Sequence, residues 1–385
     1  MTIVDMTGLP QPVAAPDQTD DALLTAGEEP VDRLDSDYHE LTETLVVTMA
    51  LGGGCCDIAV SPTTAHVYVA DHDSVRVIGT LNHVVASVPV AGHPKALAID
   101  TAGHLVCVTS HDGPVSIINT ADNTVKTMPG YSVAAALSPD GAYLYTADNA
   151  TDPAGHCGWI SVIDMESEAV AAVPVDNQVT DLAVTPDGSR LYALTSKRNS
   201  YYQYDQGAIA VIDTATRRVI DTIAVGVSPD TLRISPDGTR IYVIHPDTHS
   251  ISAVDPATRS TKIIVLQDTP LCATVTPDST HIYLTGLRSL IVVDNTTNTA
   301  ETIPVGDLPR GVQMSRDGKR AYVANFGSHT VSVLDAITNS VVNTVDVGGN
   351  PETLAVSPDG DRLYVGDYWA GRLGVIAIPS VTDHG

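Results

Sequence analysis

A single pattern of hydrophobic and polar positions recurs along the chain, and residues 353–364, T-L-A-V-S-P-D-G-D-R-L-Y, are its clearest copy. Apolar and small residues alternate up to Val356, as in a strand with one buried face. Pro358-Asp359-Gly360 then favours a tight turn, because proline presets a negative φ and glycine accepts a positive one. Leu363 and Tyr364 favour a return strand. The pattern therefore predicts a β-hairpin.

Eight copies of this hairpin follow one another, and one position of the return strand marks each copy. The marker residues are Tyr68, Cys107, Tyr145, Tyr192, Tyr242, Tyr283, Tyr322 and Tyr364. They recur at intervals of 38 to 50 residues. A period near 40 residues with four strands per repeat is typical of propeller blades. The sequence thus predicts an all-β, eight-bladed β-propeller; a seven-bladed ring with one additional copy is the alternative, which the even spacing disfavours.

The last repeat lacks a fourth strand. In the preceding repeat, the four predicted strands A to D cover residues 311–315, 320–324, 330–334 and 340–347. The last repeat ends with its third strand, at residues 373–378, whereas residues 45–51 near the start of the chain match the fourth strand of the preceding repeat. We therefore expect an N-terminal strand to complete the last blade and close the ring with backbone hydrogen bonds.

Composition divides the chain into an acidic tail at residues 1–41, one propeller domain at 42–379 and a short tail at 380–385. Residues 1–41 carry ten acidic residues and one basic residue, Arg33, which together with several prolines predicts disorder. The net charge of −26 argues against binding nucleic acid or anionic membranes, both of which need basic surfaces.

Other features of the composition concern the cellular compartment. No apolar run approaches the roughly 20 residues of a membrane span, and the N-terminus lacks the basic and apolar regions of a signal peptide. Five cysteines are too few for a disulfide framework in a chain of this length, and the odd number favours a reducing compartment. We therefore expect a cytoplasmic protein.

The repeat resembles a known family. Tyr322-Val323-Ala324-Asn325, preceded by Ser-Arg-Asp-Gly and followed by Thr-Val-Ser-Val-Leu-Asp, is similar to the YVTN family of β-propeller repeats, and the resemblance covers about residues 43–378. It implies the propeller fold. It leaves the activity open, since similar repeats occur in surface-layer proteins, lactonase-like proteins and subunits of redox enzymes. A more distant resemblance to lactonase and streptogramin-lyase propellers implies chemistry on a small molecule.

The irregular loops indicate where a site would lie. The A–B and C–D turns are uniformly short, whereas the B–C loops vary, with insertions at residues 148–159 and 196–207 in adjacent blades. We therefore place the site on the face that the D–A and B–C loops share. The predicted catalytic residues are His111, His156, Tyr201 and Asp367. The predicted substrate-binding residues are His72, Trp159, Tyr202, Tyr204, His245, Arg310, Tyr368, Trp369 and Arg372.

Charged residues and cysteines leave alternatives open. A charged residue precedes or begins the A strand in four blades: Lys95, Asp230, Arg310 and Glu352. One interpretation is that these residues form salt bridges with one another. The other is that Lys95 or Arg310 binds the carboxylate of a ligand. Several histidines could converge on one divalent metal, but no short ligand motif occurs, so we predict neither a metal site nor a cofactor. Cys55 and Cys56 are adjacent, and a vicinal disulfide is the rarer interpretation.

Two functions are consistent with these features. The first is an enzyme that binds a small organic molecule on the D–A/B–C face and acts on it by acid–base chemistry, such as hydrolysis, elimination or cyclisation. The alternative is a non-catalytic scaffold that binds a protein, peptide or ligand on the same face. We favour the enzyme, because long loops with aromatic and polar side chains are typical of small-molecule pockets.

Overall fold

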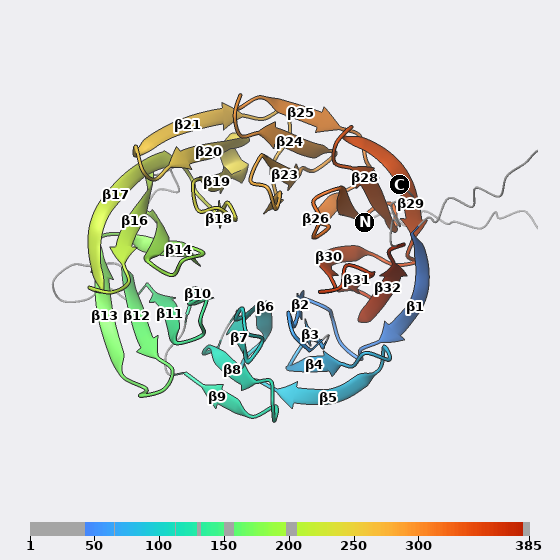
Figure 1. Ribbon diagram of the computed structural model, residues 1–385, viewed down its shortest axis with the longest axis horizontal. Coiled ribbons are helices and arrows are strands. Elements are labelled where there is room, and N and C mark those ends of the chain that lie inside the picture. The colour runs from blue at the N-terminus through green and yellow to red at the C-terminus, as the bar shows by residue number, and fades with distance from the viewer. Residues whose placement is uncertain are drawn as a thin grey trace, which may run out of the picture. The chain divides into compact units, whose positions relative to one another are not determined.

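A computed structural model describes residues 43–64, 66–111, 113–128, 132–149, 158–197 and 206–379, which all belong to one compact unit. The tails predicted at residues 1–41 and 380–385 lie outside the described residues. The described chain forms eight four-stranded antiparallel sheets. The sheets are arranged in a ring as blades, with strand A innermost and strand D outermost (Figure 1). The prediction of an eight-bladed β-propeller is therefore confirmed.

Strands A to D follow one another along the chain in seven of the blades. Those of blades one to four are β2 (Asp57–Val60), β3 (Val67–Ala70), β4 (Ser74–Ile78), β5 (Val84–Pro89), β6 (Pro94–Ile99), β7 (Leu105–Ser110), β8 (Ser116–Asn119), β9 (Val125–Thr127), β10 (Ala134–Leu137), β11 (Tyr143–Asp148), β12 (Gly158–Asp164), β13 (Val170–Val175), β14 (Gln178–Val184), β15 (Arg190–Ser196), β16 (Gln206–Asp213) and β17 (Arg218–Val227).

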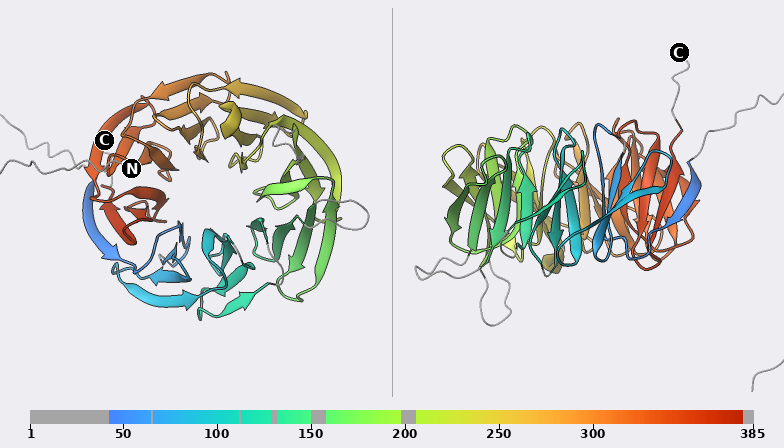
Figure 2. Two further views of the ribbon diagram at one scale, coloured as in Figure 1. Left: turned by 180° about the vertical axis from the view of Figure 1, so that it is seen from behind. Right: turned by 90° about the horizontal axis from the view of Figure 1, so that it is seen from below.

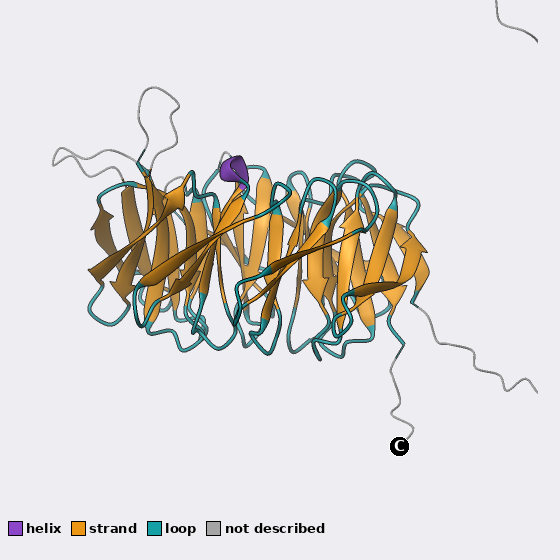
Figure 3. Cartoon of the chain, turned by 90° about the horizontal axis from the view of Figure 1, so that it is seen from above, coloured by secondary structure: helices purple, strands orange, loops and turns teal. Residues whose placement is uncertain are grey.

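Blade five also carries η1 (Pro246–Thr248), a 3-10 turn in its B–C loop and the one helical segment of the described residues (Figure 3). The strands of blades five to eight are β18 (Thr231–Ile234), β19 (Ile241–His245), β20 (Ser250–Asp255), β21 (Ser260–Val265), β22 (Cys272–Val275), β23 (His281–Thr285), β24 (Leu290–Asp294), β25 (Ala300–Ile303), β26 (Pro309–Met314), β27 (Arg320–Asn325), β28 (Thr330–Asp335), β29 (Ser340–Asp346), β30 (Pro351–Val356), β31 (Arg362–Asp367), β32 (Arg372–Ala377) and β1 (Thr44–Ala50).

The N-terminal strand closes the ring, as the sequence predicts. β1 pairs antiparallel with β32, from Thr44 opposite Ala377 to Ala50 opposite Arg372, and so supplies strand D of blade eight. Glu43, which precedes β1, is buried; its carboxylate accepts a hydrogen bond from Asn343 of blade seven and lies 3.3 Å from Arg320 Nε. The N-terminal strand is therefore held by backbone hydrogen bonds within blade eight and by side chains of blade seven.

Predicted strand bounds differ from the structure by one or two residues. In blade seven, strand A begins at Pro309 rather than at residue 311, because a β-bulge between Pro309 and Val312 extends its pairing with β27. An irregularity of this kind adds residues outside the alternating pattern, so the pattern alone does not reveal it.

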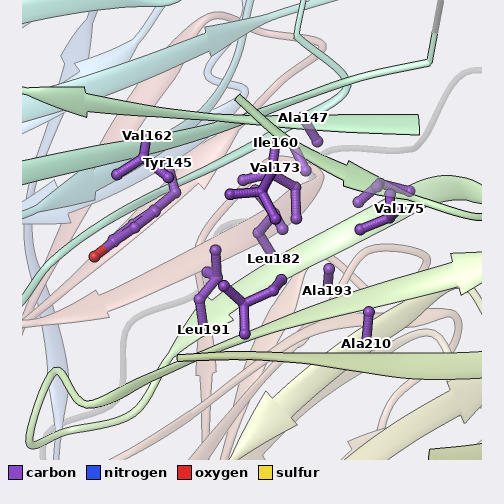
Figure 4. Packing of buried hydrophobic residues seen from close by; sticks show 13 residues of the cluster. Tyr145, Ala147, Ile160, Val162, Val173, Val175, Leu182, Leu191, Ala193 and Ala210 are labelled. Carbon is purple, nitrogen blue, oxygen red and sulfur yellow. The ribbon is translucent and has the colours of Figure 1, made fainter. Parts of the chain in front are cut away.

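The hydrophobic core lies between neighbouring blades. Figure 4 shows the cluster between blades three and four, where Ile160 and Val173 of blade three pack against Leu182 and Leu191 of blade four. All four residues are at most 6% exposed. Burying one such side chain stabilises the fold by about 1.5–3 kcal/mol. Because each sheet packs on its neighbour in this way, the ring holds the A strands in fixed positions around a central channel (Figure 1).

The A–B turns are structural elements. In blade four, Thr185 and Ser189 donate hydrogen bonds to the carboxylate of Asp187, and Gly188 has a φ of +71°. The hydrogen bond from the Thr185 side chain, with those from the Ser189 backbone and side chain, lowers the pKa of Asp187 to about 2. In an edge-on view the strands run between two faces covered by loops (Figure 2). One face carries these short A–B turns and the C–D turns, and the other carries the D–A and B–C loops.

Candidate functional site

The A strands line two adjoining cavities in the central channel. One has a volume of about 370 Å³ and lies against the A strands of blades two to five. The other has a volume of about 470 Å³ and is lined mainly by blades five to eight and blade one. Leu97 of blade two and Arg233 of blade five line both cavities and mark the boundary between them.

Charged residues gather in the smaller cavity, which we call the mouth cavity because it lies where A strands begin. Its charged lining residues are Lys95, Asp181, Asp230 and Arg233. Asp181 is held in place: its Oδ2 accepts hydrogen bonds from Thr231 Oγ1 at 2.7 Å and from the Leu232 amide at 3.0 Å. Arg233 Nη1 lies 3.7 Å from the same oxygen. A fixed carboxylate and a fixed guanidinium therefore form one side of the cavity.

Asp230 differs from Asp181 because, among the described residues, no hydrogen bond holds its carboxyl group. Desolvation and the nearby Asp181 carboxylate raise the pKa of Asp230, whereas Lys95 acts in the opposite direction. A raised pKa keeps a carboxyl group protonated to higher pH and makes its carboxylate a stronger base. Such a group beside a lysine in a cavity is suited to general acid–base chemistry.

The larger cavity carries a structural carboxylate. Asp57 Oδ2 accepts a hydrogen bond from the Leu97 amide of blade two at 2.8 Å, and Thr353 of blade eight lies within 3.4 Å of Oδ1. Burial raises the pKa of Asp57, whereas the hydrogen bonds from the Leu97 and Ile58 amides lower it by a smaller amount. Since its oxygens join three adjacent A strands, Asp57 holds the channel wall together next to the closing blade.

Several of the predicted site residues come together on the D–A/B–C face of blades eight, one and two. The rings of His72 and His93 are 4.9 Å apart, and the His111 amide donates to the His93 carbonyl. Tyr368 and Trp369 form an edge-to-face pair with ring centroids 5.8 Å apart. A β-carbon added to Gly53 would lie 3.3 Å from His72 Cβ, and one added to Gly54 would lie 3.0 Å from the Tyr368 ring. The loop of these two glycines therefore connects both groups.

Other predicted residues lie elsewhere. Arg372 is exposed at the start of β32, next to this group. Trp159 lies in β12 of blade three, opposite Pro174. Arg310, in blade seven, lies over the ring of Phe326 at 5.6 Å. His156, Tyr201, Tyr202 and Tyr204 lie outside the described residues.

His245 and Asp367 occupy equivalent buried positions at the ends of B strands. His245 is fully buried; its Nδ1 donates to the Val227 carbonyl at 2.8 Å and its Nε2 is 2.9 Å from Ser252 Oγ. Burial lowers the pKa of His245. Asp367 is 6% exposed, and its carboxylate accepts hydrogen bonds from the amides of Asn350 and Ala370. These contacts hold D–A and B–C loops in place, and they leave neither side chain open to a ligand.

A glycine in the D–A loop makes room for each of these polar side chains. A β-carbon on Gly349 would collide with the Asp367 carboxylate, and one on Gly226 would lie 3.1 Å from the His245 ring. Blade six has the reverse arrangement: Gly286 takes the B-strand position, and Asp268 of the D–A loop fills the space and accepts a hydrogen bond from Ser289. One small and one polar residue thus form a structural pair at this point of the blade.

None of the four charged residues of the mouth cavity is among the predicted catalytic or substrate-binding residues. The sequence indicates Lys95 and Asp230 only as salt-bridge partners or, for Lys95, as an anchor for a carboxylate, and it does not single out Asp181 or Arg233. The repeats carry a signal for Arg233, because its position is occupied by alanine in most other blades, namely by Ala59, Ala98, Ala136, Ala183 and Ala355. The signal for Asp181 is weaker, because Ala96, Ala134 and Cys272 occupy its position in three blades but Asp57 occupies it in blade one. A charged residue at an A-strand position that is mostly alanine indicates that the side chain faces the channel. Aligning the repeats by the A strand, and not by the marker tyrosine alone, reveals it.

The described residues hold no metal cluster, and burial raises the pKa of Cys55, Cys56 and Cys107. In residues 43–379, apart from the undescribed gaps, no three His, Cys, Asp or Glu side chains are placed to hold a metal ion. Cys55 and Cys56 are free thiols, so the structure contradicts a vicinal disulfide. Burial and the nearby Asp71 carboxylate raise the pKa of Cys56 to about 11. In this part of the chain, no helix has both the length and the apolar character to cross a bilayer.

Comparisons with known sequences find propellers. The sequence model of a family described as YNCE-like beta-propeller matches residues 219–383. Proteins named Uncharacterized protein YncE from Salmonella typhi and Salmonella typhimurium are 25% and 24% identical, over 46% of this chain and 47% of each relative. The Seven-bladed beta-propeller protein Rv1057 of Mycobacterium tuberculosis is 28% identical over 66% of this chain and 63% of its own. The chain thus spans about half the length of the YncE relatives it matches.

Solved structures show the same fold at lower identity. Kuenenia stuttgartiensis Hydrazine Synthase matches with a TM-score of 0.55 and 20% identity, over 89% of this chain and 99% of that chain. The Cps50 (Swd1) beta-propeller domain of Myceliophteria thermophila matches with a TM-score of 0.58 and 14% identity, over 88% of this chain and 100% of that chain. At these identities the likeness concerns the fold alone. Together, the sequence relatives and the eight sheets confirm that this chain resembles the YVTN-type β-propeller proteins.

Proposed function

We propose that this protein is an enzyme that acts on a small organic molecule by acid–base chemistry in the mouth cavity. The observation that carries the proposal is Asp230, a carboxyl group of raised pKa beside Lys95 in a cavity of about 370 Å³. That volume falls within the range of small-molecule pockets, which is about 300–1,000 Å³. The neighbouring Asp181 and Arg233 are already fixed by hydrogen bonds and so provide a rigid wall.

The cations Lys95 and Arg233 can stabilise negative charge on a carbonyl oxygen, and the resemblance to lactonase-type propellers supports a lactone as the substrate. In hydrolysis, the Asp230 carboxylate takes a proton from a water molecule while the water oxygen bonds to the ring carbonyl carbon. The ring C–O bond then breaks, and the leaving oxygen takes up the proton. Lys95 stabilises the negative charge that develops on the carbonyl oxygen. The products are a hydroxy acid and the regenerated carboxylate.

A lactone panel tests this proposal. Hydrolysis of γ- and δ-lactones by the purified full chain is followed by base consumption at constant pH. We expect Asp230→Asn to lower kcat/KM by about 10²–10⁴-fold, the usual contribution of a general base. Asp247→Asn is the matched control, because Asp247 is a nearby exposed carboxylate that does not line the cavity, and we expect it to keep activity within about threefold. Equal activity of the wild type and Asp230→Asn would contradict the role of Asp230.

A scaffold function is the second candidate, and the exposed aromatic pair favours it. Trp369 is 72% exposed and Tyr368 is 42% exposed on the same face. Tryptophan and tyrosine are enriched among the residues that dominate protein–protein binding energies. Trp369→Ala separates the two functions: under the scaffold function it removes partner binding, whereas under the enzyme function it leaves the chemical step at Asp230 unchanged.

A further inference from the structure

One position of strand A distinguishes three consecutive blades from the other five. In every blade this position pairs with the marker residue of strand B, so the eight residues are structurally equivalent. Blades five, six and seven carry Arg233, Thr274 and Gln313 there. The other blades carry alanine, namely Ala59, Ala98, Ala136, Ala183 and Ala355. Because alanine suffices in five blades, the fold does not require a longer polar side chain at this position.

These three residues line the larger cavity, which has a volume of about 470 Å³, together with Glu352 of blade eight. The guanidinium of Arg233 is engaged, since its Nε donates to the Ala273 carbonyl at 3.3 Å. The side chains of Thr274, Gln313 and Glu352 are half-buried, and none of them has a hydrogen bond or an ion pair within the described part of the chain. A hydroxyl, a carboxamide and a carboxylate from three adjacent blades are therefore available to a ligand.

The larger cavity presents little apolar surface to a ligand. Ile58, Val312 and Leu354 line it, but each of them belongs to a hydrophobic cluster between blades and is at most 8% exposed. An apolar ligand would exclude water from the three polar side chains without giving them new partners, which costs free energy. The lining therefore disfavours an apolar ligand.

The charges that line the larger cavity disfavour an anion and a cation alike. Glu352 and Asp57 repel an anion, whereas the side chain of Arg233, which is 42% exposed, repels a cation. A hydroxyl group is neutral and both donates and accepts hydrogen bonds. It can therefore donate to a carboxylate, accept from a threonine hydroxyl and do either with a carboxamide, which are the three groups that the cavity offers.

We propose that the larger cavity binds a neutral polyhydroxylated molecule, such as an open-chain sugar alcohol, along the wall that blades six to eight form. Hydroxyl groups of the ligand donate to the Glu352 carboxylate and to Gln313 Oε1, and they accept from Gln313 Nε2 and the Thr274 hydroxyl. The volume of the cavity lies within the range of about 300–1,000 Å³ for small-molecule pockets. This binding is independent of the chemistry proposed for the mouth cavity.

Four six-carbon ligands that differ in their polar groups test the chemical class. The neutral polyol glucitol, hexane-1,6-diol, the anion gluconate and the cation glucamine are titrated into the full chain at neutral pH and followed by NMR. We expect glucitol to bind at least about 5-fold more tightly than each of the others, which is the effect of one net hydrogen bond or of one repelled charge. Tighter binding of gluconate or glucamine would show that the cavity recognises a charge. Equal binding of hexane-1,6-diol would show that it does not recognise the additional hydroxyls, and each of these results would overturn the proposal.

Gln313→Ala tests the location of the site. The variant introduces the alanine that five blades carry at this position, so it should unfold at the same midpoint as the wild type. We expect it to bind glucitol about 5-fold more weakly, the effect of one hydrogen bond. Gln267→Ala is the matched control, because Gln267 is exposed and does not line the cavity, and it should bind like the wild type. Equal affinity of Gln313→Ala and the wild type for glucitol, or no binding by the wild type at tens of millimolar, would overturn the proposal.

The outcomes for the two cavities are separable. Loss of lactone hydrolysis in Asp230→Asn, in a wild type that does not bind glucitol, would overturn this proposal and leave the proposed function in place. Binding of glucitol that depends on Gln313, in a protein that hydrolyses no lactone, would overturn the proposed function and leave this proposal in place.

Discussion

His245 and Asp230 are both ionisable residues of blade five on the D–A/B–C side, and they are adjacent in the sheet, since the Asp230 amide donates to the Ile244 carbonyl. His245 is fully buried with both ring nitrogens engaged, because the glycine at position 226 leaves room for its ring. Asp230 instead lines an open cavity, and its carboxyl group has no hydrogen bond within the part of the chain that the structure describes. Whether a polar side chain stabilises a loop or is free to bind a ligand therefore depends more on the space around the side chain than on its chemical type.

The largest expected effect on stability comes from filling the space that a D–A loop glycine leaves for a buried polar side chain. In Gly349→Val, the new side chain collides with the Asp367 carboxylate. We expect the free energy of unfolding to fall by about 3 kcal/mol, as for other overpacked sites. Gly374→Ala is the control, because its nearest neighbour would be at an ordinary 3.5 Å, and it should change stability by less than about 1 kcal/mol. Urea unfolding measures both. A Gly349→Val protein as stable as the wild type would show that the glycine is not needed.

The pH dependence of stability tests the burial of His245. Its pKa in the folded protein lies below the value of about 6.5 for a free histidine. As the pH falls through 6.5, the unfolded chain binds a proton before the folded chain does, so stability present above pH 6.5 is lost below it. His245→Asn should remove this loss between pH 7 and pH 5, since Asn325 occupies the equivalent position in blade seven and donates to Ser332 at 2.8 Å. The same loss of stability in His245→Asn and the wild type would exclude His245 as its source.

Two marker tyrosines, Tyr283 and Tyr322, give the smallest expected effects. Tyr283→Phe removes a hydrogen bond to Asn339 and should destabilise the protein by about 1 kcal/mol. Tyr322→Phe removes a hydroxyl that has no partner among the described residues and should leave stability unchanged or slightly raised. Thermal unfolding compares the two variants directly. Equal losses of stability would mean that Tyr322 is paired in solution.

The sequence is sufficient to predict the propeller because each repeat contains its own turn and strand signals. The eight marker positions, the N-terminal closing strand and the face with irregular loops all follow from local patterns. Strand bounds are less accurate where a bulge intervenes, as at Pro309. Within the site, the charges at the start of the A strands are visible in the repeats, including Lys95 and Asp230.

The surroundings of those side chains are not visible in the sequence, because distant segments create them. The room for His245 comes from the glycine at position 226, and Asp367 is held by Asn350 and Ala370, which belong to two different loops. The mouth cavity combines A strands of four blades. Whether a carboxylate is satisfied or open depends on these contacts, and a single repeat contains no information about them.

The most direct test of this account compares Asp230→Asn with Asp367→Asn in the same two assays, lactone hydrolysis and urea unfolding. We expect Asp230→Asn to lose about 10²–10⁴-fold in kcat/KM with unchanged stability, because an open carboxyl group of raised pKa does not stabilise the fold when it is ionised. We expect Asp367→Asn to lose about 1–3 kcal/mol of stability while the folded protein keeps its activity. Full activity in Asp230→Asn together with loss of turnover in a stable Asp367→Asn would contradict it.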